Sequence, residues 1–378
     1  MINYLFRFLL LLSGCFAFLA VDGFLNGSRS LASEEIVVRY GLFEESLPVA
    51  DLRKYAETQQ ASADLRFFLG FLSSEQQQKV KKALQVNMSL DIAALDKLLD
   101  TTMGRLILSG LSQANARRDK AGIQALRSAV ILGAKSKEGL GIVSFLEAYP
   151  SKRLVIDLPK ASKLLSLANL SSKSDTPPQD NLSSSPLWQL QVKYQTLATQ
   201  GKQYSGCLFG DSISAQLGNT LGEGTFNFGL NGLSAISLVE QLQPLVTSKL
   251  KCQKTVIAIG GNDAWYGLSD ELFVKNLKQA IALVKTMGTK EIFLIPAFYS
   301  TVAASLDPTV SAPLAKVEHI NALIEQVALT EGVRVEAEGI APLYDKNVLK
   351  DNLTTDGDHL NADGLNIYRQ ALLKILAK

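Results

Sequence analysis

The sequence predicts a two-domain α/β protein, with a mostly α-helical N-terminal domain and a C-terminal domain built on a parallel sheet covered by helices on both faces. In the first half, apolar residues recur at helical spacing. In the second half, short apolar runs alternate with helical patterns, which indicates a parallel sheet. Between them, residues 171–186 are rich in Ser, Pro and Asp and too poor in apolar side chains to order themselves. We therefore expect an N-terminal segment over residues 1–32, an accessory domain over 33–170, a linker over 171–186 and a second domain over 187–378.

Composition excludes several classes of function. The 378 residues carry 38 Lys and Arg against 36 Asp and Glu, a net charge of +2, so the chain lacks the basic excess of a nucleic-acid-binding protein. Three cysteines and two histidines are too few for the usual Cys/His zinc sites. We predict no cofactor and no metal, although a carboxylate-bound metal stays open.

The N-terminus has the pattern of an export signal. Residues Phe8–Ala20 are almost entirely apolar and follow Arg7. Small residues up to Ala32 allow cleavage there, the longer apolar stretch over residues 5–25 allows an uncleaved membrane anchor, and Cys15 allows a lipidated form. We expect an exported protein, either periplasmic or anchored in a membrane and facing outside the cytoplasm.

The accessory domain has predicted helices and strands but no candidate catalytic or metal-binding residues. Ser73 and Gln76 form a capping-box pattern that opens a helix. Apolar spacing predicts further helices over 92–99 and 123–133, and short strands near 37–49 and 154–156. We find no cluster of nucleophile, base or metal ligands in this part of the sequence.

The second domain alternates strands and helices. Apolar runs predict five strands, over residues 205–209, 225–228, 255–259, 291–298 and 333–335. Helical patterns follow, over residues 273–284 and 313–329 and from Ala362 onward, with Asn361 as the cap of the last helix. Ligands of such sheets bind at the carboxyl ends of the strands.

Polar residues gather just past the predicted strand ends. Ser212 follows the first strand and could act as a nucleophile, and His359 could take its proton with Asp356 fixing the tautomer. Gly229 and Asn262 follow two other strands and could donate hydrogen bonds to an oxyanion. Each segment by itself is more readily explained as a turn or a helix cap. Their conjunction in one order predicts acyl-transfer chemistry.

These four segments resemble the conserved blocks of the SGNH family, also called GDSL esterases and lipases: the LFGDSI, NFGLNG, GGND and DGDH segments, which carry Ser212, Gly229, Asn262, and Asp356 with His359. The resemblance covers roughly residues 187–378. It implies a flavodoxin-like three-layer α/β/α fold and metal-free hydrolysis of acyl esters of lipids, glycans or small molecules.

The resemblance also suggests roles for residues in or next to the four segments. We expect Asp211, Gly232, Asp263 and Trp265 to contact the substrate. The gap from Ser212 to Gly229 is short, 17 residues, so the first crossover helix should be brief.

The first half is similar to a cyanobacterial domain of unknown function that usually precedes an α/β-hydrolase domain. The similarity lies in RYGLFEESLPVADLRKYAET, FLSSEQQQKVKKAL and LRSAVILGA, and covers roughly residues 34–165. It supports export and pairing with a hydrolase, and it implies no functional residue.

Two cysteines, one histidine and four aromatic residues carry further expectations. Strand alignment offsets Cys207 from Cys252 by about five residues, roughly 16 Å of strand, which predicts two unpaired thiols. His319 reads as a surface residue of a helix. Four aromatic residues follow strand ends and could line a pocket or pack in the core, namely Trp265, Tyr266, Phe298 and Tyr299.

The leading interpretation is an exported serine esterase. Two alternatives stay open: an O-acyltransferase of envelope polysaccharide, which would use the same residues, and a non-catalytic envelope-binding protein that uses the helical domain.

Overall fold

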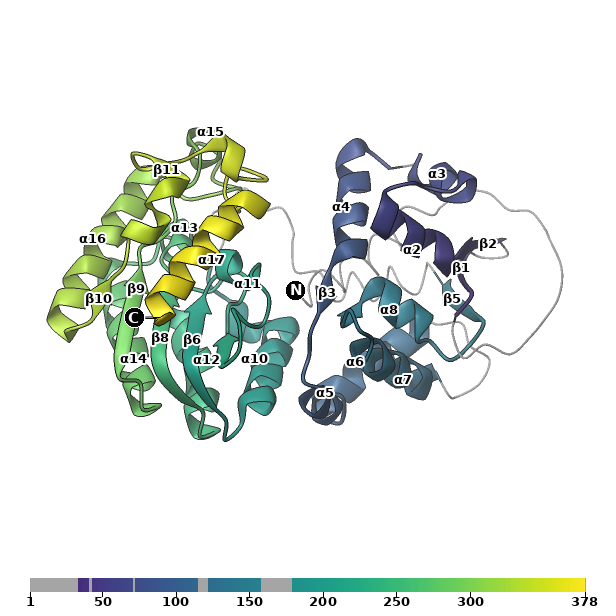
Figure 1. Ribbon diagram of the computed structural model, residues 1–378, viewed down its shortest axis with the longest axis horizontal. Helices are drawn as coiled ribbons and strands as arrows, with labels where there is room; N and C mark the ends of the chain where they lie inside the picture. The colour runs from purple at the N-terminus through teal and green to yellow at the C-terminus, as the bar shows by residue number, and fades with distance from the viewer. Residues whose placement is uncertain (1–32, 41–42, 71, 115–121, 158–178, 378) are drawn as a thin grey trace. The chain divides into compact units, whose positions relative to one another are not determined.

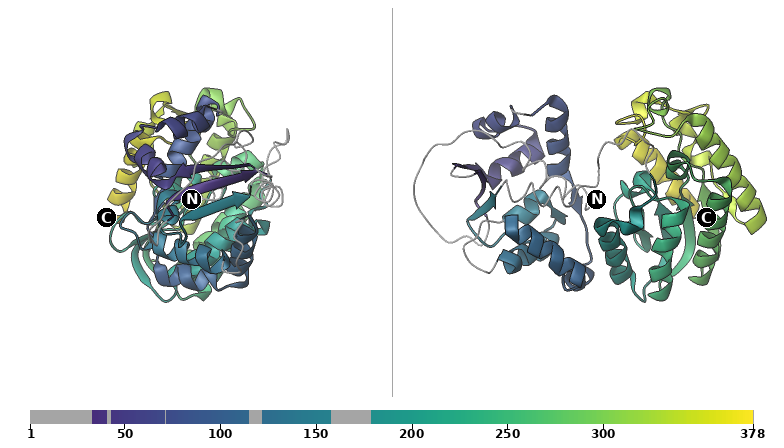
Figure 2. Two further views of the ribbon diagram at one scale, coloured as in Figure 1. Left: turned by 90° about the vertical axis from the view of Figure 1, so that its right-hand side faces the viewer. Right: turned by 180° about the vertical axis from the view of Figure 1, so that it is seen from behind.

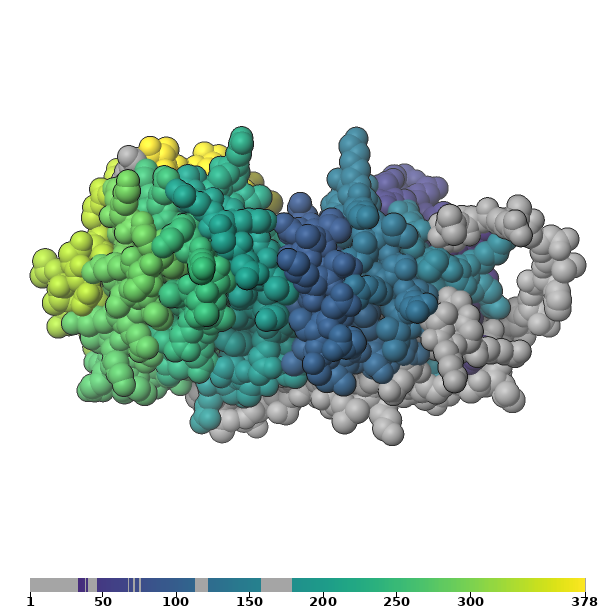
Figure 3. Space-filling view, turned by 90° about the horizontal axis from the view of Figure 1, so that it is seen from below, coloured from purple at the N-terminus to yellow at the C-terminus, as the bar shows by residue number. Residues whose placement is uncertain are grey.

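The computed structural model describes residues 33–40, 43–70, 72–114, 122–157 and 179–377. The segment predicted to direct export lies outside these residues. The chain divides into two compact units, Met1–Leu170 and Ser171–Lys378; Figure 3 shows the surface of the first in purple to blue and that of the second in teal to yellow. Among the helices of the described ranges, none is long and apolar enough to cross a membrane.

The N-terminal unit combines helices with a small mixed sheet. Strand β1 (Glu35–Tyr40) pairs antiparallel with β2 (Phe43–Pro48) and parallel with β5 (Arg153–Asp157). Two short strands, β3 (Asn87–Met88) and β4 (Leu140–Gly141), pair antiparallel. The helices are α2 (Val49–Thr58), α3 (Ala63–Leu69), α4 (Ser74–Gln85), α5 (Ile92–Leu99), α6 (Thr102–Ala114), α7 (Gly122–Ala134) and α8 (Ile142–Glu147). The expectation of a mostly helical domain therefore holds only in part, because a three-stranded sheet completes its core.

Local sequence explains several of these helices. The predicted capping box is confirmed at α4, where Ser73 accepts from the Gln76 N–H and Gln76 accepts from the Ser73 N–H. Helix α7 ends at Ala134, one residue past the predicted end at Gly133. A Cβ on Gly133 would come within 3.1 Å of the Phe145 backbone in α8, so the glycine allows the two helices to pack closely.

The C-terminal unit is built on five parallel strands, as predicted. Their order across the sheet is β10-β9-β8-β6-β7, the doubly wound order in which the first crossover leads to one edge and the later strands extend to the other. The strands are β6 (Gln203–Gly210), β7 (Thr225–Asn227), β8 (Lys251–Ala258), β9 (Glu291–Ile295) and β10 (Arg334–Val335).

Helices cover both faces of this sheet. One face packs against the helices α10 (Pro186–Thr199), α12 (Ala235–Thr247), α14 (Asp270–Thr286) and α16 (Leu314–Glu331). The other packs against α17 (Ala362–Ala377) and the 3-10 helix η2 (Glu338–Leu343). Figure 1 shows α17 in front of the sheet, and the right panel of Figure 2 shows the opposite side of the same unit. Short elements on the rim complete the unit, namely η1 (Leu182–Ser184), α11 (Ser212–Ala215), α13 (Gly261–Tyr266), α15 (Val302–Ser305), β11 (Tyr344–Asp345), β12 (Val348–Leu349) and η3 (Asp351–Leu353).

The second half of the predicted linker belongs to the C-terminal unit. Asp180 accepts a hydrogen bond from the Ser234 hydroxyl at the N-cap of α12, and its other carboxylate oxygen accepts from the Leu182 N–H at 3.2 Å. Leu182 packs against the core of the unit. Composition predicted a linker through Pro186, whereas Asp180 and Leu182 contact the C-terminal unit.

The two cysteines of this unit form a disulfide. Cys207 of β6 and Cys252 of β8 are joined with their Cα atoms 5.9 Å apart, so the prediction of two unpaired thiols is wrong. That prediction aligned Ser212 with Asn262, which offset the cysteines by five residues. The register instead pairs Cys207 with Thr255 and Tyr204 with Cys252, so the offset is three residues. In addition, the Gly224 carbonyl accepts from both the Ser205 N–H (2.8 Å) and the Gly206 N–H (3.3 Å), the pattern of a bulge, which bends a strand.

The alternation of faces changes phase at this point in both strands. Tyr204 and Cys207 are three residues apart, and Cys252 and Ile257 are five apart, yet all four pack with the same core. In a regular strand only residues an even number apart share a face. The irregularity thus turns Cys252 toward the side of the sheet that Cys207 occupies.

Candidate active site

Ser212 stands at a sharp turn from β6 into α11. A Cβ on Gly210 would lie 2.1 Å from the Ser214 hydroxyl, so only glycine permits this close approach of strand and helix. Asp211 is the N-cap of α11, and its carboxylate accepts from the Ile213 N–H at 3.0 Å. Ser212 is the first helical residue and is half-buried, which leaves its hydroxyl accessible. Helix α11 spans four residues, the brief crossover helix that the short gap predicted.

His359 lies in a loop fixed by its own hydrogen bonds. The His359 carbonyl accepts from the Thr355 N–H at 3.0 Å and from the Thr354 hydroxyl at 2.6 Å. Asp356 accepts from the His359 N–H at 2.7 Å. After this loop, Asn361 caps α17 by accepting from two N–H groups of its first turn, as predicted. The backbone therefore sets the position of the imidazole.

The structure brings Ser212, His359 and Asp356 together. His359 Nε2 lies 3.0 Å from Ser212 Oγ, and His359 Nδ1 lies 3.0 Å from Asp356 Oδ2. The serine is 147 residues from the histidine in sequence. This is the order of contacts that activates a serine hydroxyl, with the carboxylate on the far nitrogen of the ring.

The charges of the site favour a protonated imidazole. Burial tends to raise the pKa of Asp356, but hydrogen bonds from the His359 ring and N–H outweigh it and lower that pKa to about 2. For His359, burial tends to lower the pKa, yet the hydrogen bond with Asp356 and the nearby charges of Asp358 and Asp211 raise it. The imidazolium that forms when His359 takes a proton is thus stabilised.

The two expected oxyanion donors differ in what they bind. Asn262, in α13, lines the pocket beside Ser212 and donates from Nδ2 to the Leu233 carbonyl at 3.2 Å. The Gly229 N–H donates to Asn227 Oδ1 at 2.9 Å. Glycine is required at position 229 because a Cβ there would lie 2.7 Å from the Ala215 N of α11.

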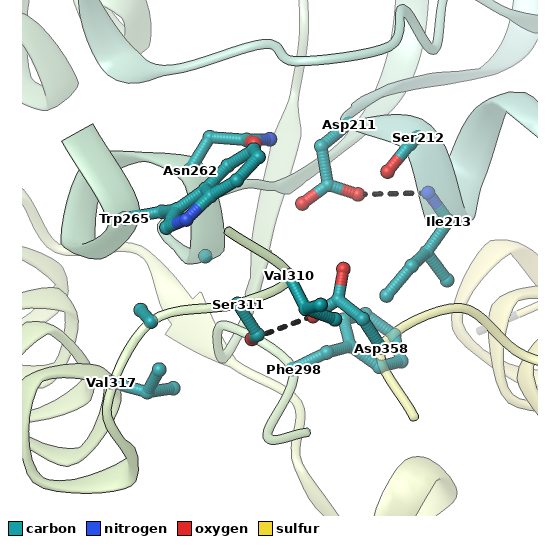
Figure 4. Close-up of a pocket in the computed structure, with 12 residues that line it drawn as sticks. Asp211, Ser212, Ile213, Asn262, Trp265, Phe298, Val310, Ser311, Val317 and Asp358 are labelled. Carbon is teal, nitrogen blue, oxygen red and sulfur yellow. Dashed lines mark hydrogen bonds between the residues drawn. The ribbon is translucent and has the colours of Figure 1, made fainter. Parts of the chain in front are cut away.

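A small pocket with a volume of about 30 Å³, partly open to solvent, adjoins Ser212. Figure 4 shows the carboxyl groups of Asp211 and Asp358 directed into it, with Asn262 and Trp265 on another wall. Its polar lining is Asp211, Ser212, Asn262, Ser311 and Asp358, and its apolar lining is Ile213, Trp265, Phe298, Val310, Ala312 and Val317. Burial, with a smaller contribution from the charge of Asp358, raises the pKa of Asp211 to about 7. The site can therefore accept a ligand that is part apolar and part hydrogen-bonding.

One of the expected substrate contacts is wrong. Asp263 is fully buried, and its Oδ1 accepts from the Ala235 N–H at 2.8 Å, at the first residue of α12. Asp263 follows Asn262 in sequence but supports the start of α12, because the turn after β8 directs Asn262 to the pocket and the next residue into the core. Gly232 is half-buried and its carbonyl accepts from the Tyr266 hydroxyl at 2.8 Å, and its contact with a substrate stays a prediction.

The positions of His319 and of the four aromatic residues can be compared with the expectations for them. His319 is confirmed as a surface residue of α16, with a side chain 56% exposed and 2.9 Å from Asp270. Trp265 and Phe298 line the pocket, whereas Tyr266 binds Gly232 and Tyr299 packs edge-on against Tyr344 with ring centroids 5.6 Å apart.

Sequence reasoning missed three residues of the site. Asp358 and Ser311 line the pocket and bind each other at 2.8 Å, and Asn227 holds Gly229. A carboxylate directly before the candidate base was a visible signal for Asp358. Within the described ranges, no group of three or more His, Cys, Asp or Glu residues could hold a metal ion.

Comparisons with known proteins agree with this geometry. Residues 199–367 match the family model described as GDSL-like Lipase/Acylhydrolase family, and residues 32–157 match the one described as Alpha/beta hydrolase of unknown function (DUF1400). No curated protein matches the chain.

Solved structures resemble the C-terminal half. A GDSL-like lipase from Bacteroides thetaiotaomicron is 17% identical with a TM-score of 0.40, over 47% of this chain and 88% of its own. An acetylxylan esterase from Geobacillus stearothermophilus is 17% identical with a TM-score of 0.37, over 47% and 95%. These likenesses are distant, so the identification rests on the family model. The C-terminal domain belongs to the GDSL-like lipase/acylhydrolase family, and the protein is a carboxylic ester hydrolase of that type.

Proposed function

We propose that the protein hydrolyses esters through a covalent acyl-enzyme formed on Ser212. The observation that carries this proposal is the unbroken chain of contacts from Asp356 Oδ2 through His359 to Ser212 Oγ, each 3.0 Å long. A hydroxyl bonded to an imidazole whose other nitrogen meets a carboxylate is an activated nucleophile.

The steps follow from these contacts. Ser212 Oγ attacks the ester carbonyl while His359 Nε2 takes the hydroxyl proton, and Asp356 stabilises the imidazolium. The tetrahedral intermediate then breaks its bond to the alcohol, which leaves with the proton from His359. Water, deprotonated by the same nitrogen, attacks the acyl-serine and releases the carboxylic acid and free Ser212.

The oxyanion needs donors already aimed at it. We assign this role to the Ser212 N–H at the start of α11 and to the Asn262 side-chain amide, which has a second N–H beside the one bonded to Leu233. The Gly229 N–H would join them only if it released Asn227 Oδ1.

The pocket lining supports an ester with an apolar part and hydroxyl groups, such as a lipid or an acylated glycan. Transfer of the acyl group to a sugar hydroxyl would use the same residues. Products formed with an added glycan acceptor distinguish the two, since hydrolysis yields free acid and transfer yields an acylated glycan.

We also propose export, to the periplasm or the outer side of a membrane. The apolar run of residues 8–20 supports it, and so does the Cys207–Cys252 disulfide, because such bonds persist mainly in oxidising compartments. Separating cell fractions and measuring the intact mass of the isolated protein tests both the location and the fate of the N-terminus; full-length protein in the cytosol would contradict the proposal.

The first experiment measures hydrolysis of short- and medium-chain p-nitrophenyl esters by residues 33–378. We expect Ser212→Ala to lower kcat/KM by at least about 10³-fold. Ser184→Ala is the matched control, because Ser184 is exposed and its hydroxyl bonds only to the nearby Asn181 carbonyl. Equal loss in both variants, or turnover that survives Ser212→Ala, would refute the acyl-enzyme.

A further inference from the structure

Two carboxylates face one nitrogen of the imidazole. His359 Nδ1 lies 3.0 Å from Asp356 Oδ2 and 3.9 Å from Asp358 Oδ2. The nearer carboxylate is the more exposed of the two, with 52% of its side chain accessible against 32% for Asp358. Asp358 also has a partner of its own, because Ser311 Oγ donates to its Oδ1 at 2.8 Å. The hydrogen bond from Ser311 therefore holds the Asp358 carboxylate in a fixed position near the ring.

The backbone between them explains the arrangement. Gly357 has a φ of +91°, which L side chains rarely adopt, and a Cβ there would come within 2.8 Å of Ala304 and of Thr301. The Gly357 carbonyl accepts from the Thr301 N–H at 2.8 Å. The Asp358 N–H donates to Asp356 Oδ1 at 3.1 Å. These contacts hold the loop in a form in which both carboxylates reach the same ring.

We propose that Asp358, held by Ser311, is a positioning residue of the triad: a second carboxylate that keeps the proton on His359 Nδ1, so that Nε2 stays free to take the proton of Ser212. It assists Asp356 in the intact enzyme and takes over part of its role when Asp356 is lost. The proposal rests on the triad proposed above, but part of its test does not depend on activity.

The charges around His359 make the contribution of Asp358 measurable. The groups that face the ring are Asp356 and Asp358 from its own loop and Asp211 from the cap of α11. Among the described residues, none of these three carboxylates pairs with Lys or Arg. Loss of the Asp358 charge should therefore lower the pKa of His359 and move the acid limb of the kcat/KM profile to lower pH.

Nuclear magnetic resonance tests the proposal without any substrate. The chain has two histidines, so ¹⁵N-histidine labelling gives two imidazoles, and His319→Gln assigns them. We expect Asp358→Asn to lower the pKa of His359. We expect Asp356→Ala to keep the neutral ring protonated on Nδ1, and the double variant Asp356→Ala/Asp358→Asn to give a mixture of tautomers. Asp270→Asn, which removes the carboxylate beside His319, is the matched control and should leave His359 unchanged.

Kinetic measurements test the reserve role of Asp358, which is to take over part of the role of Asp356 when Asp356 is lost. We expect kcat/KM of Asp356→Ala to exceed that of the double variant by roughly tenfold, the scale of one charge about 4 Å away in a water-like medium. Ser311→Ala should shift the acid limb in the same direction as Asp358→Asn, and Ser311→Thr, which keeps the hydroxyl, should restore it.

The two readouts separate the possible failures. If Asp358→Asn leaves the pKa and the tautomer of His359 unchanged in folded protein, Asp358 has only a structural role and the proposal is wrong. Equal kcat/KM for the single and double variants contradicts the reserve role. Should Ser212→Ala retain full turnover, the proposed function fails, while the resonance data still decide what Asp358 does to His359.

Discussion

Asn262 is the residue whose side chain alone can test the oxyanion site. Its amide reaches the pocket beside Ser212, and one of its two N–H groups donates to the Leu233 carbonyl. We expect Asn262→Ala to lower kcat by about 10²–10³-fold with little change in KM, because the donor acts mainly on the transition state.

Asn276→Ala is the control for this prediction, since Asn276 is a half-buried residue of α14 and bonds to the Leu272 carbonyl of its own helix. Ester hydrolysis under saturating substrate measures kcat directly. A loss below tenfold for Asn262→Ala, in protein with an unchanged melting temperature, would remove Asn262 from the oxyanion site.

Asp263 links the stability of the fold to pH. Its Oδ1 binds the Ala235 N–H, but its Oδ2 is buried with no hydrogen-bond partner among the residues that the structure describes. Burial, with a smaller contribution from the nearby charge of Asp180, raises the pKa of Asp263 to about 7. The folded protein thus holds this proton more tightly than the unfolded chain, whose aspartates titrate near 4. Its contribution to stability is present below pH about 4 and is lost as the pH rises through about 7.

We therefore expect Asp263→Asn to raise the free energy of unfolding at pH 8 by about 1–3 kcal/mol, the cost of one buried unsatisfied polar group. At pH 4 the variant and the parent should differ little. Urea titrations at the two pH values give the comparison. A destabilised variant at pH 8 would mean that the carboxylate is needed in its ionised form.

At the scale of elements, the sequence predicts the strands better than it predicts the disulfide that links two of them. The five strands of the parallel sheet and the α4 capping box were predictable, because apolar runs and cap residues are local signals. The disulfide was not. It depends on the register of β6 against β8 and on an irregularity in β6 that hydrogen bonds to Gly224 reveal, and no local pattern encodes either.

The same holds for the residues of the site: local motifs predict some of them, whereas the roles of others depend on contacts between residues far apart in the sequence. Motif residues at strand ends led to Ser212 and Asn262, because topology brings such ends together, and the DGDH segment before the last helix led to His359. Asp263 was assigned to the substrate by its neighbourhood in sequence, yet the turn after β8 sends it into the core. Asp358 became visible only through its distances to Ser311 and to the ring of His359.

The disulfide joins the two central strands that lead to Ser212 and to Asn262. Both cysteines are almost fully buried, so the bond should resist reduction in the folded protein. We expect the Cys207→Ala/Cys252→Ala variant to unfold more easily by about 2–4 kcal/mol, because the bond closes a loop of 45 residues in the unfolded chain.

Urea unfolding of oxidised parent and double variant measures this difference. Intact mass after alkylation, without reduction, establishes that the parent carries the bond. If alkylation modifies both thiols in the untreated protein, the cysteines are unpaired and the predicted loss of stability should vanish with them.

At the scale of the whole molecule, the described site residues all come from the C-terminal unit. Ser212, Asn262 and His359, together with the pocket lining, lie between residues 211 and 359. Both histidines of the chain also lie there. The first unit therefore supplies no histidine base, although it matches a family described as an alpha/beta hydrolase.

This division predicts that a chain of residues 179–378 folds and hydrolyses short esters with kcat/KM within about threefold of residues 33–378, since it keeps every described contact of the site. A chain that starts at residue 187 should be less stable, because it loses the bond from Ser234 to Asp180 and the packing of Leu182. Thermal melts of the two shorter chains compare their stability, and p-nitrophenyl esters of increasing chain length compare their substrate preference. If residues 179–378 fold but lose activity or change their preference for acyl length, the N-terminal unit contributes to substrate recognition, and the ester hydrolase then requires both units to define its substrate.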